Sequence, residues 1–204
     1  FEDNSGNETT EFKRAYVEGK LGGLNVTAGR YGAFFANGNI YDAKADGVEV
    51  SYGDKVKVTG FAGKGTDAVD DASFGNYCGG ELSGAFDNLN LAAGYVNFKD
   101  MGIKNEDTNV DNAIWYVGGD YTMGDVNLSA MYLKGDMSEN DKDVTGIDDD
   151  GWTVGLTYKG AEASEAGSWG LFANYYDLGG MTYVAHTTDA NSFGDYGVDK
   201  VQTG

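Results

Sequence analysis

The sequence lacks several features that would assign it to a familiar class of protein. No stretch approaches the ~20 consecutive apolar residues of a membrane-spanning helix, although a membrane-spanning strand needs only ~9–11 residues and stays possible. A single cysteine, Cys78, excludes an internal disulfide. Basic residues are scarce: 14 stand against 33 acidic ones, and the net charge of −19 argues against a nucleic-acid partner.

Proline is absent as well, whereas glycine and aromatic residues are abundant, with 33 Gly, 14 Tyr, 10 Phe and 3 Trp. The stretch RAYVEGKLGGLNVTAGRYG, residues 14–32, alternates small apolar residues with polar or charged ones on either side of a Gly-Gly pair. A period of two indicates strands, because successive side chains of a strand point to opposite faces. Composition and periodicity together predict an all-β protein.

The same hairpin pattern recurs along all 204 residues, which we treat as one domain. Tight turns at Gly22-Gly23, Gly53-Asp54, Asp87-Asn88 and Gly124-Asp125 alternate with long polar connections. No long helix with an apolar face is present in the pattern. About ten strands are predicted, at 9–21, 24–31, 46–53, 55–63, 77–86, 89–98, 113–123, 126–134, 151–159 and 168–178.

One face of these strands is apolar, and its aromatic residues stand at the strand ends. Trp152 and Tyr158, for example, bracket Val154 and Leu156. Trp and Tyr favour the membrane–water interface, and an aliphatic band between two aromatic girdles is typical of an outer-membrane barrel. We predict the following interface aromatics: Tyr52, Tyr95, Trp115, Tyr121, Tyr132, Trp152, Tyr158, Trp169 and Tyr175.

An antiparallel transmembrane β-barrel explains both faces, because the apolar face would meet lipid and the charged face would line water. A soluble β-sandwich or β-solenoid also alternates and is the main alternative. It would bury large aliphatic residues, whereas many apolar positions here are Ala, Gly and Val, and it would rarely lack proline across so many turns. The pattern therefore favours the barrel.

The segments FKRAYVEGKLGGLNVTAGRYG, DGVEVSYGDKVKVTGFAG and NYCGGELSGAFDNLNLAAGYVNF resemble the porins. In particular, they resemble the S-layer-homology (OmpM-type) porins of diderm Firmicutes. The strand pattern covers the whole chain, but the specific motif is confined to the first 60 residues. The resemblance implies an outer-membrane porin, a water-filled channel for passive diffusion of small hydrophilic solutes and ions.

The resemblance also implies partners and a context. We expect outer-membrane lipid around the barrel, assembly as a homo-trimer, and contact with peptidoglycan only through a domain absent from this chain. The segment is expected to be an internal piece of a larger barrel. Two alternatives stay open: a structural tether whose barrel acts mainly as an anchor, and a substrate-specific channel.

The connection after Gly29-Arg30-Tyr31 is the best candidate for a loop that folds inward and narrows the pore. Opposed charges across such a constriction would filter solutes by size and charge. Because Arg30 shares parity with the lipid-facing residues before it, this hypothesis requires a bulge near Gly29. Alternatively, Arg30 anchors the loop to a carboxylate and the lysines are ordinary solvated charges. The predicted constriction residues are Arg30, Asp42, Asp46, Glu49, Lys55 and Lys57.

No feature of the sequence predicts an enzyme, a cofactor or a strong metal site. His186, the only histidine, lies in a polar connection without the strand-held partners that a barrel hydrolase needs. Asp141 and Asp143 resemble the start of a calcium loop, but Trp152 stands where the bidentate Glu would be. A solvated external loop is the favoured interpretation of that stretch.

Overall fold

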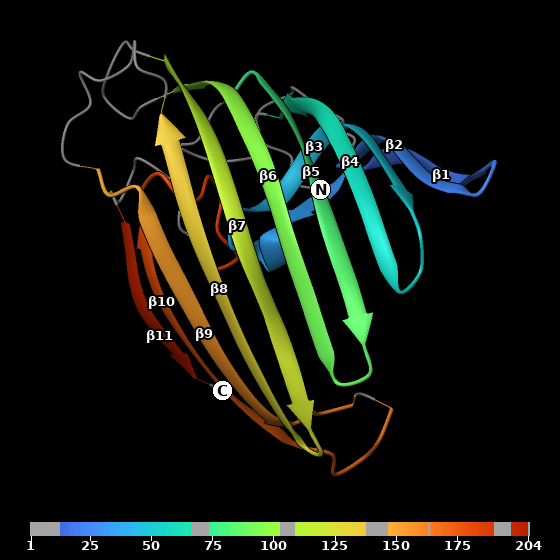
Figure 1. Ribbon diagram of the computed structural model, residues 1–204, viewed down its shortest axis with the longest axis vertical. Coiled ribbons are helices and arrows are strands. Elements are labelled where there is room, and N and C mark those ends of the chain that lie inside the picture. Colours follow the sequence, from blue (N-terminus) through green and yellow to red (C-terminus); the bar gives the residue numbers. More distant parts are fainter. Residues whose placement is uncertain are drawn as a thin grey trace, which may run out of the picture.

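The computed structural model describes residues 13–66, 74–102, 109–137, 147–162, 164–189 and 197–203. The protein is all-β: its strands form one antiparallel sheet in which each strand pairs with its neighbours in the chain (Figure 1). The eleven strands are β1 (Ala15–Leu21), β2 (Leu24–Phe35), β3 (Tyr41–Tyr52), β4 (Val56–Gly65), β5 (Asn76–Phe86), β6 (Leu89–Gly102), β7 (Asn109–Met123), β8 (Val126–Met137), β9 (Asp150–Lys159), β10 (Gly170–Gly179) and β11 (Gly197–Thr203).

Short turns join the strands at one end of the sheet, which we call the turn end. Gly22 and Gly23 have φ values of +57° and +88°, and Gly53 and Gly124 have +104° and +59°. Glycine adopts these left-handed conformations without steric strain because it has no Cβ atom, which explains the tight hairpins predicted there. The predicted strands correspond to β1–β10, and β11 was not predicted. We call the opposite end, where the longer connections lie, the loop end.

The sheet is strongly curved and open. Figure 1 shows β1 and β11 at its two ends, and no pairing between these two strands occurs among the described residues. The curvature defines a convex and a concave face. Within the described part of the chain, no helix is long and apolar enough to cross a membrane.

The two faces differ sharply in exposure. On the convex face, large apolar side chains have no cover: Val117 and Val58 are 56% and 57% exposed, and Leu82 is 54% exposed. On the concave face, the same strands bury their apolar side chains. Leu133, Ile114 and Val96 have no exposed surface. The hydrophobic core of this protein therefore lies entirely within the curve of the sheet.

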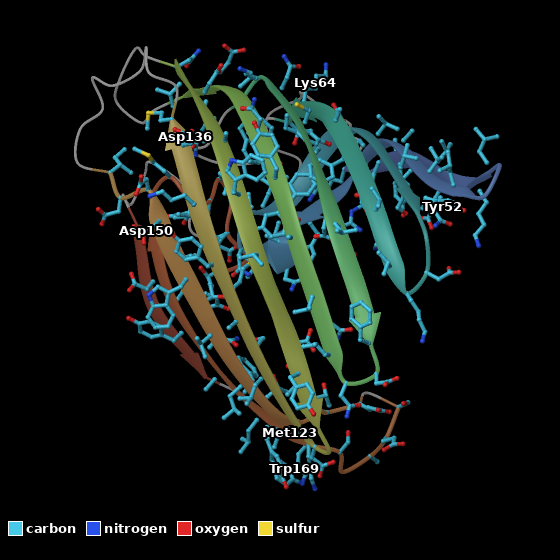
Figure 2. The ribbon with its side chains drawn as sticks, in the orientation of Figure 1. Tyr52, Lys64, Met123, Asp136, Asp150 and Trp169 are labelled. Carbon is cyan, nitrogen blue, oxygen red and sulfur yellow. The ribbon has the colours of Figure 1, made fainter. Side chains whose placement is uncertain are left out.

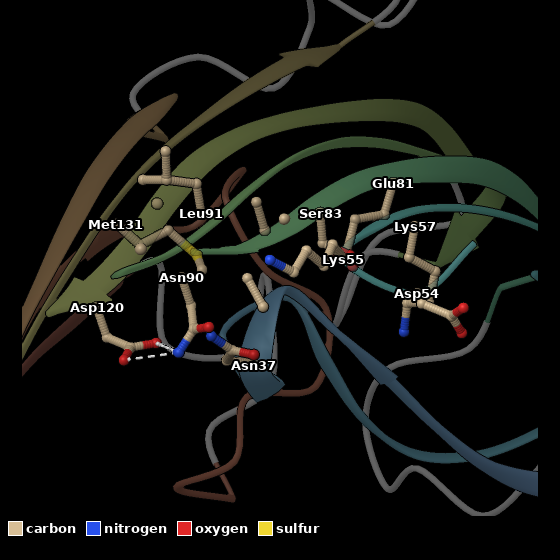
Figure 3. A pocket seen from close by; sticks show the side chains of 15 residues that line it. Asn37, Asp54, Lys55, Lys57, Glu81, Ser83, Asn90, Leu91, Asp120 and Met131 are labelled. Atoms are coloured by element: carbon tan, nitrogen blue, oxygen red, sulfur yellow. Dashed lines mark hydrogen bonds between the residues drawn. The ribbon is translucent and has the colours of Figure 1, made fainter. Parts of the chain in front are cut away.

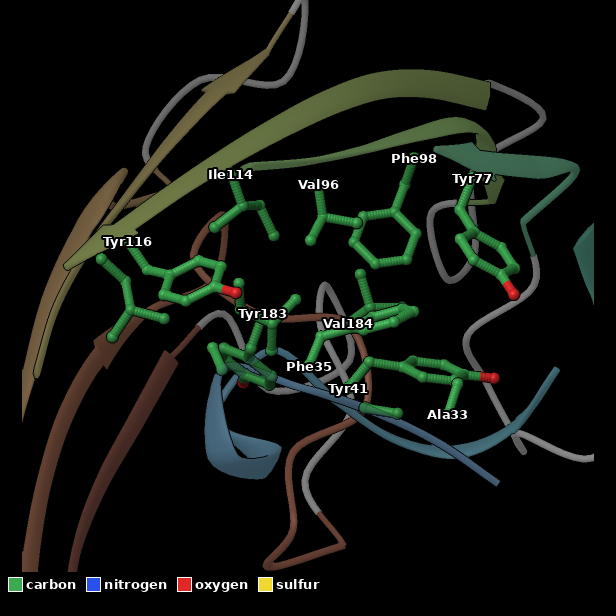
Figure 4. Packing of buried hydrophobic residues seen from close by; sticks show 14 of the residues in the cluster. Ala33, Phe35, Tyr41, Tyr77, Val96, Phe98, Ile114, Tyr116, Tyr183 and Val184 are labelled. Carbon is green, nitrogen blue, oxygen red and sulfur yellow. The ribbon is translucent and has the colours of Figure 1, made fainter. Parts of the chain in front are cut away.

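The core packs the loop-end half of the sheet against two segments that cross its concave side. Ile114, Val96 and Phe98 point from the sheet toward Phe35, the last residue of β2, and Tyr41, the first residue of β3 (Figure 4). Phe35 stacks on Phe61 of β4 with ring centroids 4.3 Å apart. Such aromatic pairs add stabilisation beyond the area they bury.

Candidate functional site

The first segment on the concave side is a flap made of residues 31–45: the end of β2, a short 3₁₀ turn η1 (Ala36–Gly38), and the start of β3. Sequence analysis ended β2 at residue 31 and began β3 at residue 46, whereas the strands extend to Phe35 and from Tyr41. Tyr31, Phe35 and Tyr41 are buried against the sheet, while Phe34 on the opposite parity is 57% exposed. Burial of one parity explains why the hairpin continues past the predicted boundary.

The second segment, residues 181–189, runs along the flap. Val184 N–H donates to the carbonyl of Ile40 at 2.9 Å, and Asp42 N–H donates to the carbonyl of Ala185 at 2.8 Å. A parallel bridge joins Tyr41 to Ala185. Segments that are more than 140 residues apart in sequence are thus held together as one inner layer.

Two buried polar side chains join the flap to this second segment. Asn39 Nδ2 donates to the carbonyl of Ala36 at 2.9 Å, and Asn39 Oδ1 lies 3.2 Å from His186 Nε2. Thr188 N–H donates to His186 Nδ1 at 3.2 Å. These contacts match the neutral imidazole that carries its proton on Nε2 and donates it to Asn39. His186 therefore joins the flap to residues 181–189 through its ring nitrogens.

Two of the predicted constriction residues lie on the convex face. Arg30 Nε and Nη2 donate to the two carboxylate oxygens of Asp46 at 2.7 and 2.8 Å. The β2–β3 register runs without a shift through Gly29, so the predicted bulge is wrong. Arg30 keeps the convex parity of Val26, because side chains on a regular strand alternate strictly.

A third predicted residue, Asp42, lies on the side of the flap turned away from the core. Thr187 Oγ1 donates to Asp42 Oδ2 at 2.8 Å, and both residues are exposed. Asp42 therefore ties the flap to residues 181–189 and is not brought near Lys55 or Lys57.

The remaining predicted residues, Glu49, Lys55 and Lys57, share the concave face. Lys55 and Lys57 line a recess of about 320 Å³, which we call the charged recess (Figure 3). The tip of the flap reaches this recess through Asn37. The charged or amide side chains around it are Asn37, Asp54, Lys55, Lys57, Glu81, Asn90 and Asp120.

Hydrogen bonds hold the acids of the concave face in place. Tyr116 donates its hydroxyl to Glu81 Oε2 at 2.7 Å, and Asn90 and Asn127 donate to Asp120 at 3.1 and 2.9 Å. Glu81 and Asp120 project from β5 and β7, Lys57 projects from the start of β4, and Lys55 directly precedes that strand. Asp54 and Glu81 thus lie on the same side of the recess as the lysines, and Asp120 lies on the other side (Figure 3).

The nine predicted aromatic residues all lie on the convex parity and form two rows. Eight are exposed, and Tyr95 is half-buried beside Trp115, with ring centroids 4.4 Å apart. Near the loop end, the ring centroids of Trp152 and Tyr175 are 5.1 Å apart. Near the turn end, the ring centroids of Tyr158 and Trp169 are 5.8 Å apart. The ammonium of Lys159 lies 5.0 Å from the centroid of the Trp169 ring.

Charged groups gather beyond the loop-end row of aromatics. Figure 2 shows Lys64, Asp136 and Asp150 toward the loop end, and Met123 and Trp169 at the turn end. Lys99 forms an ion pair with Asp111, and its ammonium lowers the pKa of that carboxyl below the ordinary value.

The concave apolar core is the feature that sequence analysis missed. A signal was present: near the loop end both parities become apolar, as in Ile114-Trp115-Tyr116 and Met131-Tyr132-Leu133. Apolar residues on the second parity indicate that the concave face is also covered at this end, here by the flap and residues 181–189.

No family model matches this chain, and no curated protein matches its sequence. Among the described residues, no group of three or more His, Cys, Asp or Glu side chains could hold a metal ion. Asp141 and Asp143, the weak calcium-loop candidates, lie outside the described residues.

Proposed function

We propose that this chain forms part of an outer-membrane β-barrel porin, a water-filled channel for passive diffusion of small hydrophilic solutes and ions. The observation that carries the proposal is the convex face, where aliphatic side chains stand uncovered between two rows of aromatic rings. Soluble proteins rarely leave an apolar surface of this extent open to water. Outer-membrane barrels show this arrangement because lipid covers it.

The spacing of the aromatic rows supports a location in a membrane. Trp115 and Tyr121 stand six positions apart on β7, and Trp152 and Tyr158 stand six apart on β9. At ~3.3 Å per residue the rows are about 20 Å apart along the strands. Strands of outer-membrane barrels tilt by ~35–45°, so the rows would be about 15 Å apart along the membrane normal and would lie within the apolar band, which is ~25 Å tall in such barrels.

A spanning sheet with free edges is unfavourable in lipid, because unpaired backbone groups cannot bond to water there. In the proposed state β1 and β11 therefore pair with further strands to complete a larger barrel. The proposed partners are outer-membrane lipid and small hydrophilic solutes, and the proposed assembly is a homo-trimer. No catalytic group and no cofactor take part.

The concave face would then line the channel, and the flap would narrow it. Lys55, Lys57, Glu81 and Asp120 would set the electrostatic field at the narrow part, since charges lining a pore select among ions. The proposed constriction thus keeps Glu49 and the lysines of the predicted set and does not include Arg30, Asp42 and Asp46.

A barrel that acts mainly as an anchor is the second candidate function. It is favoured by the apolar core, because Phe35, Tyr41 and their neighbours fill the concave side at the loop end. Recesses such as the charged one lie beside this core.

Single-channel recording separates the two functions. The full-length protein, whose further strands complete the proposed barrel, is folded in detergent and added to a planar lipid bilayer in salt solution, and its insertion is checked by flotation with lipid vesicles. A porin gives discrete current steps of constant size. Insertion without current steps would reject the channel and leave the anchor, and a protein that does not float with the vesicles would reject both.

A further inference from the structure

The concave face holds a second recess whose lining differs in kind from that of the charged recess. It has a volume of about 210 Å³, and no described residue that lines it is acidic or basic. We call it the neutral recess. Its polar side chains are amides and hydroxyls, from Asn37, Asn39, Ser129, Thr153, Asn174 and Tyr176.

The register of three strands builds the floor of this recess. Ser129, Gly155 and Asn174 lie side by side on β8, β9 and β10. A Cβ atom on Gly155 would lie 2.4 Å from Ser129 Oγ and 2.7 Å from Asn174 Oδ1. Glycine at this position therefore lets the hydroxyl and the amide converge over it, which any side chain would prevent.

The flap forms the opposite side of the recess. Asn37, at the tip of the flap, is exposed although its neighbours Ala36 and Gly38 are buried. It lines both the neutral and the charged recess. A solute passing the tip of the flap would thus meet charges on one side and only neutral polar groups on the other.

We infer that the neutral recess is a binding subsite for one ring of an uncharged, polyhydroxylated solute such as a saccharide. This inference rests on the proposed channel function. Amides and hydroxyls both donate and accept hydrogen bonds, as sugar hydroxyls do. An ion held there would lose water without gaining a charged partner, which is unfavourable. The recess is large enough for several water molecules, which leaves room for a single ring.

The test uses maltotriose, a neutral trisaccharide, with the protein in planar bilayers. We expect maltotriose to interrupt the current reversibly, and we expect Asn174→Leu and Ser129→Ala each to weaken this block at least tenfold. The matched control is Ser83→Ala, which removes the same hydroxyl from the charged recess and should change the block less than twofold. Gluconate, a charged polyol, should block the wild-type channel more weakly than maltotriose.

Each result separates this inference from the proposed function. A conducting protein that maltotriose does not block, or whose block is the same in Asn174→Leu, overturns the subsite and leaves the porin intact. If no current appears, the porin proposal fails, and calorimetric titration of the detergent-folded protein with maltotriose decides the subsite. Heat of binding that is lost in Asn174→Leu supports the subsite, and absence of heat in the wild type overturns it.

Discussion

At the scale of single residues, Val154 and Thr157 lie on the same strand, β9, but on opposite faces of the sheet. Val154 is 43% exposed on the convex face, and Thr157 lies on the concave face. An arginine near the middle of a lipid-facing strand costs about 2–4 kcal/mol, whereas a channel-facing substitution costs far less. We therefore expect Val154→Arg to lower the free energy of unfolding from lipid vesicles by about that amount. Thr157→Arg is the control, and equal losses in both would mean that lipid does not cover the convex face.

A second pair of residues tests which charges face the channel. We expect Lys57→Glu to shift ion selectivity toward cations, because Lys57 lines the charged recess. Arg30→Gln removes a basic group of the same charge from the convex face, where Arg30 is paired with Asp46. Its expected effect is a loss of about 0.2–1 kcal/mol in stability, without a change in selectivity. Reversal potentials in a salt gradient measure the ion selectivity of each variant. A change of selectivity in Arg30→Gln would mean that Arg30 faces the channel.

At the scale of elements, the flap and residues 181–189 behave as one layer only if their polar junction is intact. Asn39→Ala removes the acceptor that His186 Nε2 contacts, and His186→Ala removes the donor that Asn39 Oδ1 contacts. A buried polar group that loses its partner costs about 1–3 kcal/mol. We expect each variant to lose stability on this scale and the double variant to lose less than the sum.

The difference between the double variant's loss of stability and the sum of the two single losses is the coupling energy between the side chains. Chemical unfolding of the single and double variants measures it. Asp42→Asn serves as the control, because its bond to Thr187 is exposed. We also expect noisier channel currents in Asn39→Ala, since the flap would be less firmly held. Fully additive losses would show that the junction does not couple the two segments.

At the scale of the whole molecule, the three tryptophans report on the surroundings of the convex face. Trp115, Trp152 and Trp169 are 57%, 43% and 51% exposed there. In lipid vesicles we expect bromine-labelled lipid to quench their fluorescence strongly, because interfacial tryptophans lie at headgroup depth. Iodide in the water should quench them weakly. Strong iodide quenching with no response to the brominated lipid would contradict the proposed topology.

Much of the sheet could be predicted because the relevant signals are local. The faces on which Val154 and Thr157 lie follow from the alternation of the strand alone. The turns at Gly53 and Gly124 follow from the residue type. Arg30 shows where this reasoning failed: the constriction hypothesis required a bulge, but the parity of the strand continues through Gly29. The opposed-charge constriction itself stays a prediction, centred on Glu49, Lys55 and Lys57.

By itself the sequence determined the all-β class, the hairpin order and the division of each strand into two faces. These features depend on the period of two and on turn residues, which act over a few positions. Only the tertiary structure decided that the flap covers the concave face. Asn39 meets Met131 and His186, which lie 92 and 147 residues away. Contacts over such distances leave no periodic trace in the chain, and they arise only when the curved sheet brings its inner surface around a core.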